Sequence, residues 1–265
     1  MALVFTAIAA HTPVLIPSIG KAGIELVEKT VTAMERLEQN LYLAQPDVII
    51  VISPHGDSLP DAFTMNMTGR YVSNFEEFGD LVTKVEWKPA MMLMDRLRED
   101  FKKTDFKMVM TSAENLDYGT AVPLYYLTRH IPAVKVIPIT PSSKLDLKTH
   151  YDFGKKMKEE IMASTSRIAI IASADLSHRA GEKSPEGMSA EGIAFDEKIQ
   201  EILRERNPIG VLDINDAWLD EAGTCSGRAL AMMFGILDGV QHEVEILSYE
   251  KPFGVGYLVA SVRVS

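Results

Sequence analysis

The chain has 265 residues, of which 46% are hydrophobic and 24% are charged, a composition typical of a folded domain with a full core. Its formal net charge of −10 argues against binding to nucleic-acid backbones or anionic lipids. The single cysteine, Cys225, excludes a disulfide within the chain, and no apolar run approaches the ~18 residues of a membrane span. We therefore expect a cytoplasmic protein without nucleic-acid or membrane partners, folded as one domain over residues 1–265.

A short apolar run followed by a helical pattern recurs along the chain. In chain order, we expect strands at residues 4–10, 47–53, 106–111, 134–139, 167–174, 242–249 and 254–264. We expect helices at residues 22–43, 87–102, 122–130, 144–162, 192–206 and 226–237. In the third helix Pro123 would occupy the first turn, where a missing N–H costs little.

This alternation predicts an α/β fold with a mainly parallel central sheet, helices on both faces and antiparallel C-terminal strands. The second strand contains a continuous apolar run and the fifth is mostly apolar, as expected for strands that are buried on both faces of a parallel sheet. Residues 59–86 follow neither pattern and carry Phe63, Tyr71, Phe75 and Phe78. We expect a hairpin or a lid over one end of the sheet there.

Three of the six histidines directly follow predicted strands. His11 comes after the first strand, His55 after the second and His178 after the fifth. Ligands of open α/β sheets bind outside the carboxyl ends of the strands. We therefore expect these three imidazoles to meet in one metal-centred site, whereas the other three histidines are expected to have structural roles.

Two neutral imidazoles and one anionic group commonly hold Zn(II) or Fe(II) and leave positions open for substrate. Spacing alone does not choose the anionic group. The candidates are Asp57, Asp117, Asp175, Glu221 and the thiolate of Cys225. A zinc hydrolase that uses the same ligands and a bound water is one chemistry that such a site allows.

Five short motifs are spread over nearly the whole chain. They are AHTP at residues 10–13, SPHGD at 53–57, NLDYG at 115–119 with VPL at 122–124, ADLSH at 174–178, and SYE at 248–250 with PFGVGY at 252–257. In this order they resemble the class III extradiol dioxygenase superfamily with its LigB-like fold. The Memo-related branch is the most similar, and the resemblance implies AMMECR-type and radical-SAM partner proteins.

The resemblance also implies roles for the site residues. His11 and His55 would ligate a non-haem Fe(II), and His178 would act as acid and base on a hydroxyl of a small aromatic substrate. Ring-cleaving relatives often carry a histidine beside the substrate where this chain has Tyr118, which can donate a hydrogen bond but cannot shuttle protons near pH 7.

The third ligand departs from the ring-cleaving pattern, in which it is a glutamate from a late segment. Cys225 or Ser226 occupies that place here, as in the Memo-related branch, and Glu221 lies about one helical turn earlier. A cysteine ligand would favour Zn or Cu over Fe(II), because a thiolate is a softer donor. Without the resemblance, Cys225 would more often be a small buried hydrophobe.

The resulting prediction is an Fe(II)-dependent extradiol ring-cleavage dioxygenase that acts on a catechol-type substrate. The alternative is a Memo-like metal-binding protein with a redox or partner-binding role and no ring cleavage. A homodimer is expected only because dimers are the commonest soluble assembly.

Overall fold

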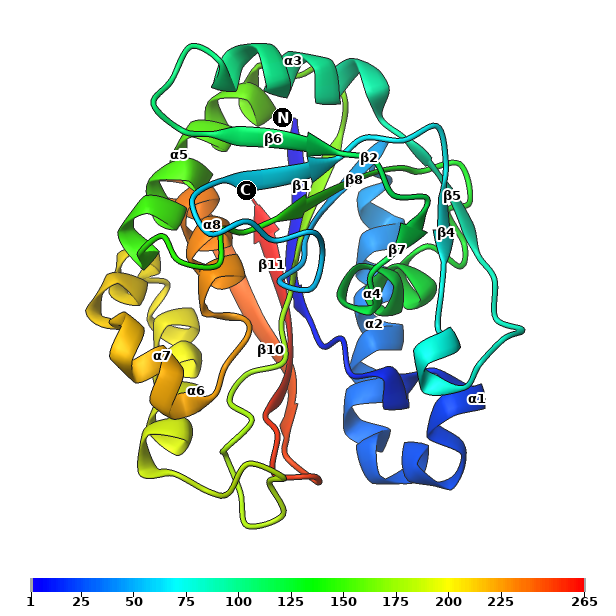
Figure 1. Cartoon of the computed structure of the whole chain (residues 1–265), viewed down its shortest axis with the longest axis vertical. Helices are drawn as coiled ribbons and strands as arrows, with labels where there is room; N and C mark the ends of the chain where they lie inside the picture. Colours follow the sequence, from blue (N-terminus) through cyan, green and yellow to red (C-terminus); the bar gives the residue numbers. More distant parts are fainter. Residues whose placement is uncertain (1, 265) are drawn as a thin grey trace.

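The computed structural model describes residues 2–264, which form a single α/β domain (Figure 1). Its strands are β1 (Leu3–Ala9), β2 (Val48–Ile52), β3 (Phe63–Asn66), β4 (Tyr71–Ser73), β5 (Glu86–Pro89), β6 (Met108–Thr111), β7 (Asn115–Leu116), β8 (Lys135–Thr140), β9 (Ile168–Ser173), β10 (His242–Glu250) and β11 (Tyr257–Val264). Its α-helices are α1 (Pro17–Gly20), α2 (Glu28–Ala44), α3 (Met91–Phe101), α4 (Tyr118–Leu127), α5 (Leu147–Ala163), α6 (Ala190–Glu205), α7 (Asp216–Ala222) and α8 (Gly227–Leu237).

Within the described residues the strands form one mixed, mostly parallel sheet of 11 strands. The main path has the order β10-β11-β1-β9-β2-β8-β5-β4-β7, and β3 and β6 extend it from β8. Strand β11 runs antiparallel to both β1 and β10. The predicted α/β class, the mainly parallel sheet and the antiparallel C-terminal strands are therefore confirmed.

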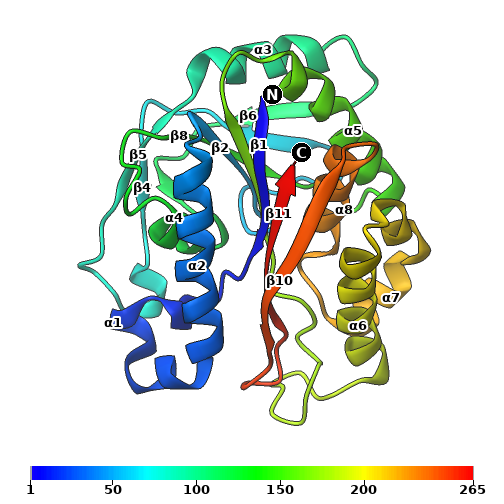
Figure 2. The same ribbon diagram turned by 180° about the vertical axis from the view of Figure 1, so that it is seen from behind.

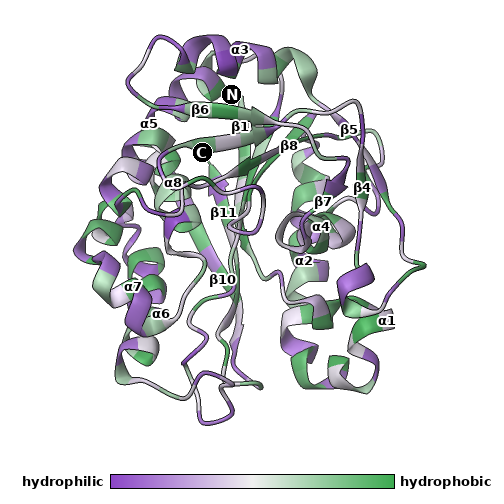
Figure 3. Ribbon diagram, in the orientation of Figure 1, coloured by the Kyte–Doolittle hydropathy of each residue, from purple (hydrophilic) through white to green (hydrophobic). Residues whose placement is uncertain are grey.

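The central strands β1, β9, β2 and β8 are parallel neighbours. Every residue of β2 and β9 is buried, and their isoleucines and valines project to both faces of the sheet. Helices α2 and α4 cover one face, and α5 and α8 cover the other, with one apolar cluster beneath each pair (Figure 2). Hydrophilic residues gather on outer helices such as α3 and α6 (Figure 3).

Of the two alternatives expected for residues 59–86, the hairpin is found and the lid is not, because β4 pairs antiparallel with the next strand, β5. These residues contribute β3, which pairs with β6 and β8, and β4, which pairs with β5 and β7. Phe63, Tyr71 and Phe75 are fully buried in the two cores. The aromatic side chains of this segment therefore pack inside the domain, and its short strands extend the sheet.

Several element boundaries also differ from the prediction. Residues 87–89 belong to β5, and the helix that follows begins only at Met91. Helix α4 begins at Tyr118 because Asp117 caps it by accepting a hydrogen bond from the Thr120 N–H, so Pro123 lies inside the helix. Helix α7 was not expected; the side chain of Asn215 caps it in the same way.

Parallel strands bring their carboxyl ends to one edge of the sheet. Ala9 at the end of β1 is in register with Ser173 at the end of β9, and Ile52 at the end of β2 is in register with Ala172. The segments that carry the strand-end histidines therefore start side by side. No helix within residues 2–264 combines the length and apolar character needed to cross a bilayer.

Candidate metal centre

His11 follows β1 and is almost fully buried, with 2% of its surface exposed. Its Nδ1 lies 2.9 Å from the Ser173 hydroxyl oxygen, and that hydroxyl donates its proton to the Gly119 carbonyl at 2.5 Å. Because the hydroxyl proton is used in this way, Ser173 accepts a hydrogen bond from Nδ1–H of the imidazole. This arrangement leaves the Nε2 lone pair of His11 free to face the centre of the site.

His55 follows β2, and its Nε2 lies 3.1 Å from Nε2 of His11. The ring of Tyr118, the first residue of α4, stacks on His55 with the centroids 4.3 Å apart. The Tyr118 hydroxyl lies 3.0 Å from Nε2 of His55. A Cβ atom at the next residue, Gly119, would lie 2.5 Å from the Ser53 hydroxyl and 3.0 Å from the imidazole. The start of α4 can therefore approach the two histidines only with glycine at this position.

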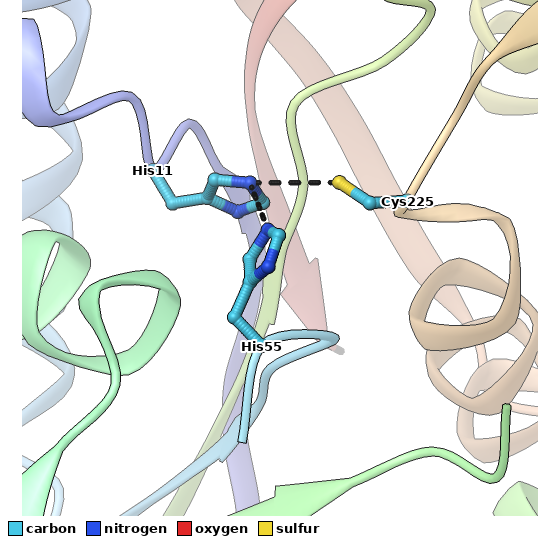
Figure 4. A group of neighbouring side chains, drawn as sticks. All are labelled: His11, His55 and Cys225. Carbon is cyan, nitrogen blue, oxygen red and sulfur yellow. Dashed lines mark hydrogen bonds between the residues drawn. The ribbon is translucent and has the colours of Figure 1, made fainter. Parts of the chain in front are cut away.

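Cys225 reaches the same point from the loop between α7 and α8. Its Sγ lies 3.6 Å from Nε2 of His11 and 4.0 Å from Nε2 of His178. One donor atom each from His11, His55 and Cys225 lies within 4.8 Å of the others (Figure 4). Sequence spacing left the third ligand open, and the geometry places the thiol of Cys225 beside the two imidazoles.

Two of the three separations between these donor atoms match those expected across a shared metal ion. Metal–nitrogen bonds of about 2.0–2.1 Å and a metal–sulfur bond of about 2.3 Å, in tetrahedral geometry, separate two nitrogens by about 3.3 Å and nitrogen from sulfur by about 3.6 Å. The N–N distance between His11 and His55 is 3.1 Å and the N–S distance between His11 and Cys225 is 3.6 Å. The third pair, His55 and Cys225, has donor atoms within 4.8 Å of each other, so the three residues form a group that can hold a metal ion.

The electrostatics of the site favour neutral ligands. Burial, and next the neighbouring His178, lower the pKa of His11 to about 3. Burial, and next His11, lower the pKa of His55 to about 4. Both imidazoles are therefore uncharged near pH 7 and can ligate a metal without first losing a proton.

Burial shifts two acidic groups in the site toward their neutral forms. Burial raises the pKa of the Cys225 thiol well above its usual range, and the nearby Asp175 raises it further. Burial also raises the pKa of Asp175 to about 7. The Oδ1 of Asp175 accepts the backbone N–H of His11 at 2.9 Å, and its Oδ2 lies 3.7 Å from Nε2 of His11. A metal cation would favour the charged forms of both groups.

The other predicted site residues differ in how exposed they are and in whether they reach the donor atoms. The side chain of His178 is 31% exposed, and its Nδ1 lies 3.6 Å from a carboxylate oxygen of Glu186. Ser226 is buried, with its hydroxyl 3.0 Å from that of Thr224. Glu221 is exposed on α7, and the donor group of the site does not include it. The structure thus brings Cys225, and not Glu221, to the histidines.

Sequence reasoning missed two supporting groups. Ser173 is the one hydroxyl residue in the otherwise aliphatic strand β9, and this polar residue in a buried apolar run could have identified it. Asp117, considered only as a metal ligand, instead accepts hydrogen bonds from the Ser53 hydroxyl at 2.5 Å and from the Thr120 N–H at 2.9 Å. It therefore links the end of β2 to the start of α4.

A polar cavity of about 250 Å³ reaches His55 from the side of β3, β7 and β8. The carboxylates of Asp57, Glu77 and Asp117 line it together with asparagine and threonine side chains. His55 therefore belongs to the metal-donor group and also lines a cavity that is large enough for a small polar group.

Comparisons with known proteins identify the family and the fold of the chain. The model of the family described as the catalytic LigB subunit of aromatic ring-opening dioxygenase matches residues 5–260. Protein CA_C1420 of Clostridium acetobutylicum is 29% identical over 262 residues; the match covers 96% of this chain but 56% of that protein, so the chain spans about half the length of this relative. The crystal structure of the uncharacterized protein JW3007 from Escherichia coli K12 has the same fold, with a TM-score of 0.66 and 14% identity over 97% of this chain and 99% of that chain.

Proposed function

Because the chain belongs to the family of the catalytic LigB subunit of aromatic ring-opening dioxygenases, we propose that it is a metal-dependent dioxygenase that opens the ring of a catechol-type substrate. One observation carries the proposal: the donor atoms of His11, His55 and Cys225 converge, with His178 beside them. A fold does not fix a function, so the argument depends on this constellation of side chains.

The metal that we propose is Fe(II), which when bound supplies the redox chemistry with O₂ that side chains lack. The chain's own residues would supply the proton transfers. Nε2 of His178 can accept a proton from a hydroxyl of the diol. The ring is partly exposed, so a substrate can reach it, and it lies next to the thiol of Cys225 in the donor group. Burial raises the pKa of Tyr118 above its ordinary value, so its hydroxyl stays protonated and can donate a hydrogen bond.

The test is aerobic turnover of Fe(II)-loaded protein with a panel of catechols. We expect O₂ uptake together with the absorbance of a ring-opened product, and we expect His178→Gln to lower kcat by about 10²–10⁴-fold, the usual contribution of an acid–base group. His130→Gln is a matched control, because His130 is exposed and pairs with Glu38 away from the site. Absence of O₂ uptake with every catechol would contradict the proposed activity.

A second function is favoured by the thiol of Cys225. A thiolate is a soft donor and selects Cu or Zn over Fe(II), which suits a metal-binding protein with a redox or partner-binding role and no ring cleavage. Metal analysis of anaerobically purified protein separates the two functions. Copper or zinc that is lost in Cys225→Ala supports the second function, whereas iron that supports turnover supports the first.

A further inference from the structure

One buried carboxyl group lies outside the metal centre. Asp196 belongs to α6 and is 1% exposed. Its Oδ1 accepts the backbone N–H of Ser177 at 2.8 Å, and its Oδ2 accepts the hydroxyl of Tyr249 at 2.7 Å. Burial raises the pKa of Asp196 to about 7, so holding this group inside the protein opposes its ionisation. A buried carboxyl group of this kind calls for a structural or functional explanation.

The neighbours of Asp196 come from the two late sequence motifs, which otherwise contribute no metal donor. The backbone of Gly256 pairs with the segment after β9, donating its N–H to the Ser177 carbonyl at 2.9 Å and accepting the Leu176 N–H at 2.7 Å. A Cβ atom at Gly256 would lie 2.0 Å from Oδ2 of Asp196. Only glycine therefore lets this backbone lie against the carboxyl group.

Ser177 also holds the loop that carries Cys225. Its hydroxyl donates to the Ala222 carbonyl at 2.6 Å, and Ser177 forms a β-bridge with Thr224. The next N–H along the chain, that of His178, points to the Gly223 carbonyl at 3.4 Å. Ser177 thus contacts three parts of the molecule: α6, the C-terminal hairpin and the loop that carries Cys225.

The imidazole of His178 has few restraints of its own. Its side chain is 31% exposed, and Glu186, at 3.6 Å, is a half-exposed partner. A half-exposed contact of this length restrains a side chain weakly. The backbone at residues 176–178 therefore sets where the ring stands, and Asp196 is one of the side chains that hold this backbone: it accepts the Ser177 N–H, while the Ser184 hydroxyl donates to the His178 carbonyl.

We propose that Asp196 is a positioning residue that places His178 at the metal centre through the backbone of Ser177, and that Tyr249 and Gly256 hold Asp196 in place. The proposal rests on the proposed function for the proton-transfer role of His178. It assigns a task to the closing motif of the chain: the hydroxyl of Tyr249 and the missing side chain of Gly256 shape the pocket in which Asp196 is held.

The first test needs no metal and no turnover. Imidazole ¹H–¹⁵N spectra of the protein give a signal for each ring, and His178→Gln identifies that of His178. We expect Asp196→Ala to shift or broaden the His178 signal, because the Ser177 N–H loses its acceptor. Asp196→Asn should restore it, since an amide oxygen can accept that N–H and the amide N–H₂ can donate to Tyr249.

Glu38→Ala is the matched control, because Glu38 is also a buried helix carboxylate and accepts a hydrogen bond from His130. It should change the His130 signal and leave that of His178 unchanged. A folded Asp196→Ala protein with an unchanged His178 signal would overturn the proposal. If Asp196→Ala does not fold, Tyr249→Phe removes a single hydrogen bond to the carboxyl group and should move the same signal by less; an unchanged signal there is equally contradictory.

The second test uses turnover. With a catechol that the wild type opens, Asp196→Ala should lower kcat by about 10-fold or more while KM and metal content stay within about twofold, because a displaced proton-transfer group slows chemistry without removing a ligand. Asp196→Asn should recover most of the loss. If the wild type opens no catechol, the proposed function fails, and the His178 signal still decides the positioning role.

Discussion

The middle of the sheet and its carboxyl edge both contain almost fully buried side chains, but of opposite chemistry. Ile50 and Ile170, which face each other across β2 and β9, are fully buried. At the edge, His11 and Asp175 are 2% and 5% exposed. Burial of the isoleucines stabilises the fold, whereas burial of the imidazole and the carboxyl group shifts their pKa toward the neutral forms. The apolar middle of the sheet therefore stabilises the fold that positions the edge, and the polar side chains at the edge are suited to bind an ion.

Ile170→Ala should show the largest effect on stability, because it opens a cavity in the middle of the sheet. We expect the free energy of unfolding to fall by about 2–5 kcal/mol. Urea denaturation followed by circular dichroism measures it. The metal content per folded molecule should not change, since Ile170 is not one of the metal-donor residues. A loss below about 1 kcal/mol would mean that the middle of the sheet does not support the edge as we describe.

Asp196→Asn should change how stability depends on pH. Burial raises the pKa of Asp196 to about 7 from 3.8, so the folded protein binds this proton more tightly than the unfolded chain does. The associated stability is complete below pH 4 and is lost as the pH rises to about 7, with an upper limit of about 4 kcal/mol for three pKa units. The Asn variant should lose that part of the slope between these values. Urea midpoints from pH 4 to 8 test it, and an unchanged slope would contradict it.

Ser173→Ala should weaken metal binding without removing a ligand. The hydroxyl fixes the His11 tautomer, and loss of such a supporting hydrogen bond lowers metal affinity by about 10–100-fold. Competition with a chromophoric chelator measures the affinity. Ser261→Ala is the matched control, because Ser261 is a buried strand serine whose hydroxyl has no hydrogen-bond partner among residues 2–264. Equal affinities of the two variants would show that Ser173 does not orient the imidazole.

The middle of the sheet was the part most open to prediction from sequence. Between Asp47 and Ser53, residues 48–52 are all apolar, a pattern typical of a strand that is buried on both faces of a parallel sheet. The short strands β3 and β4 were not found. They have 4 and 3 residues, and their pairing with β6, β8, β5 and β7 depends on contacts that no local pattern encodes.

At the edge, sequence could predict which residues follow strands but not which loop reaches them. His11 and His55 lie where strand ends must bring them. The choice between Glu221 and Cys225 depended on a Gly223 turn with φ of 60° that ends α7, which places the thiol inward and leaves the carboxylate on the exposed helix. Spacing of one helical turn between the two candidates could not show that the helix stops between them.

Asp175→Asn should give the smallest change in stability. It distinguishes the edge of the sheet from the middle most clearly, because it should raise the stability of the metal-free protein and weaken metal binding. Without metal, the variant should be more stable than the wild type by about 1 kcal/mol at pH 8, because a buried carboxylate with no cationic partner is replaced by a neutral amide that still accepts the His11 N–H. With metal, it should bind more weakly, because an anionic group 3.7 Å from Nε2 of His11 is lost. A substitution in the apolar middle cannot give this combination, since it lowers stability whether or not an ion is bound. Thermal melts of metal-free and Zn(II)-loaded protein measure both signs, and a variant less stable in both states would place Asp175 with the structural core.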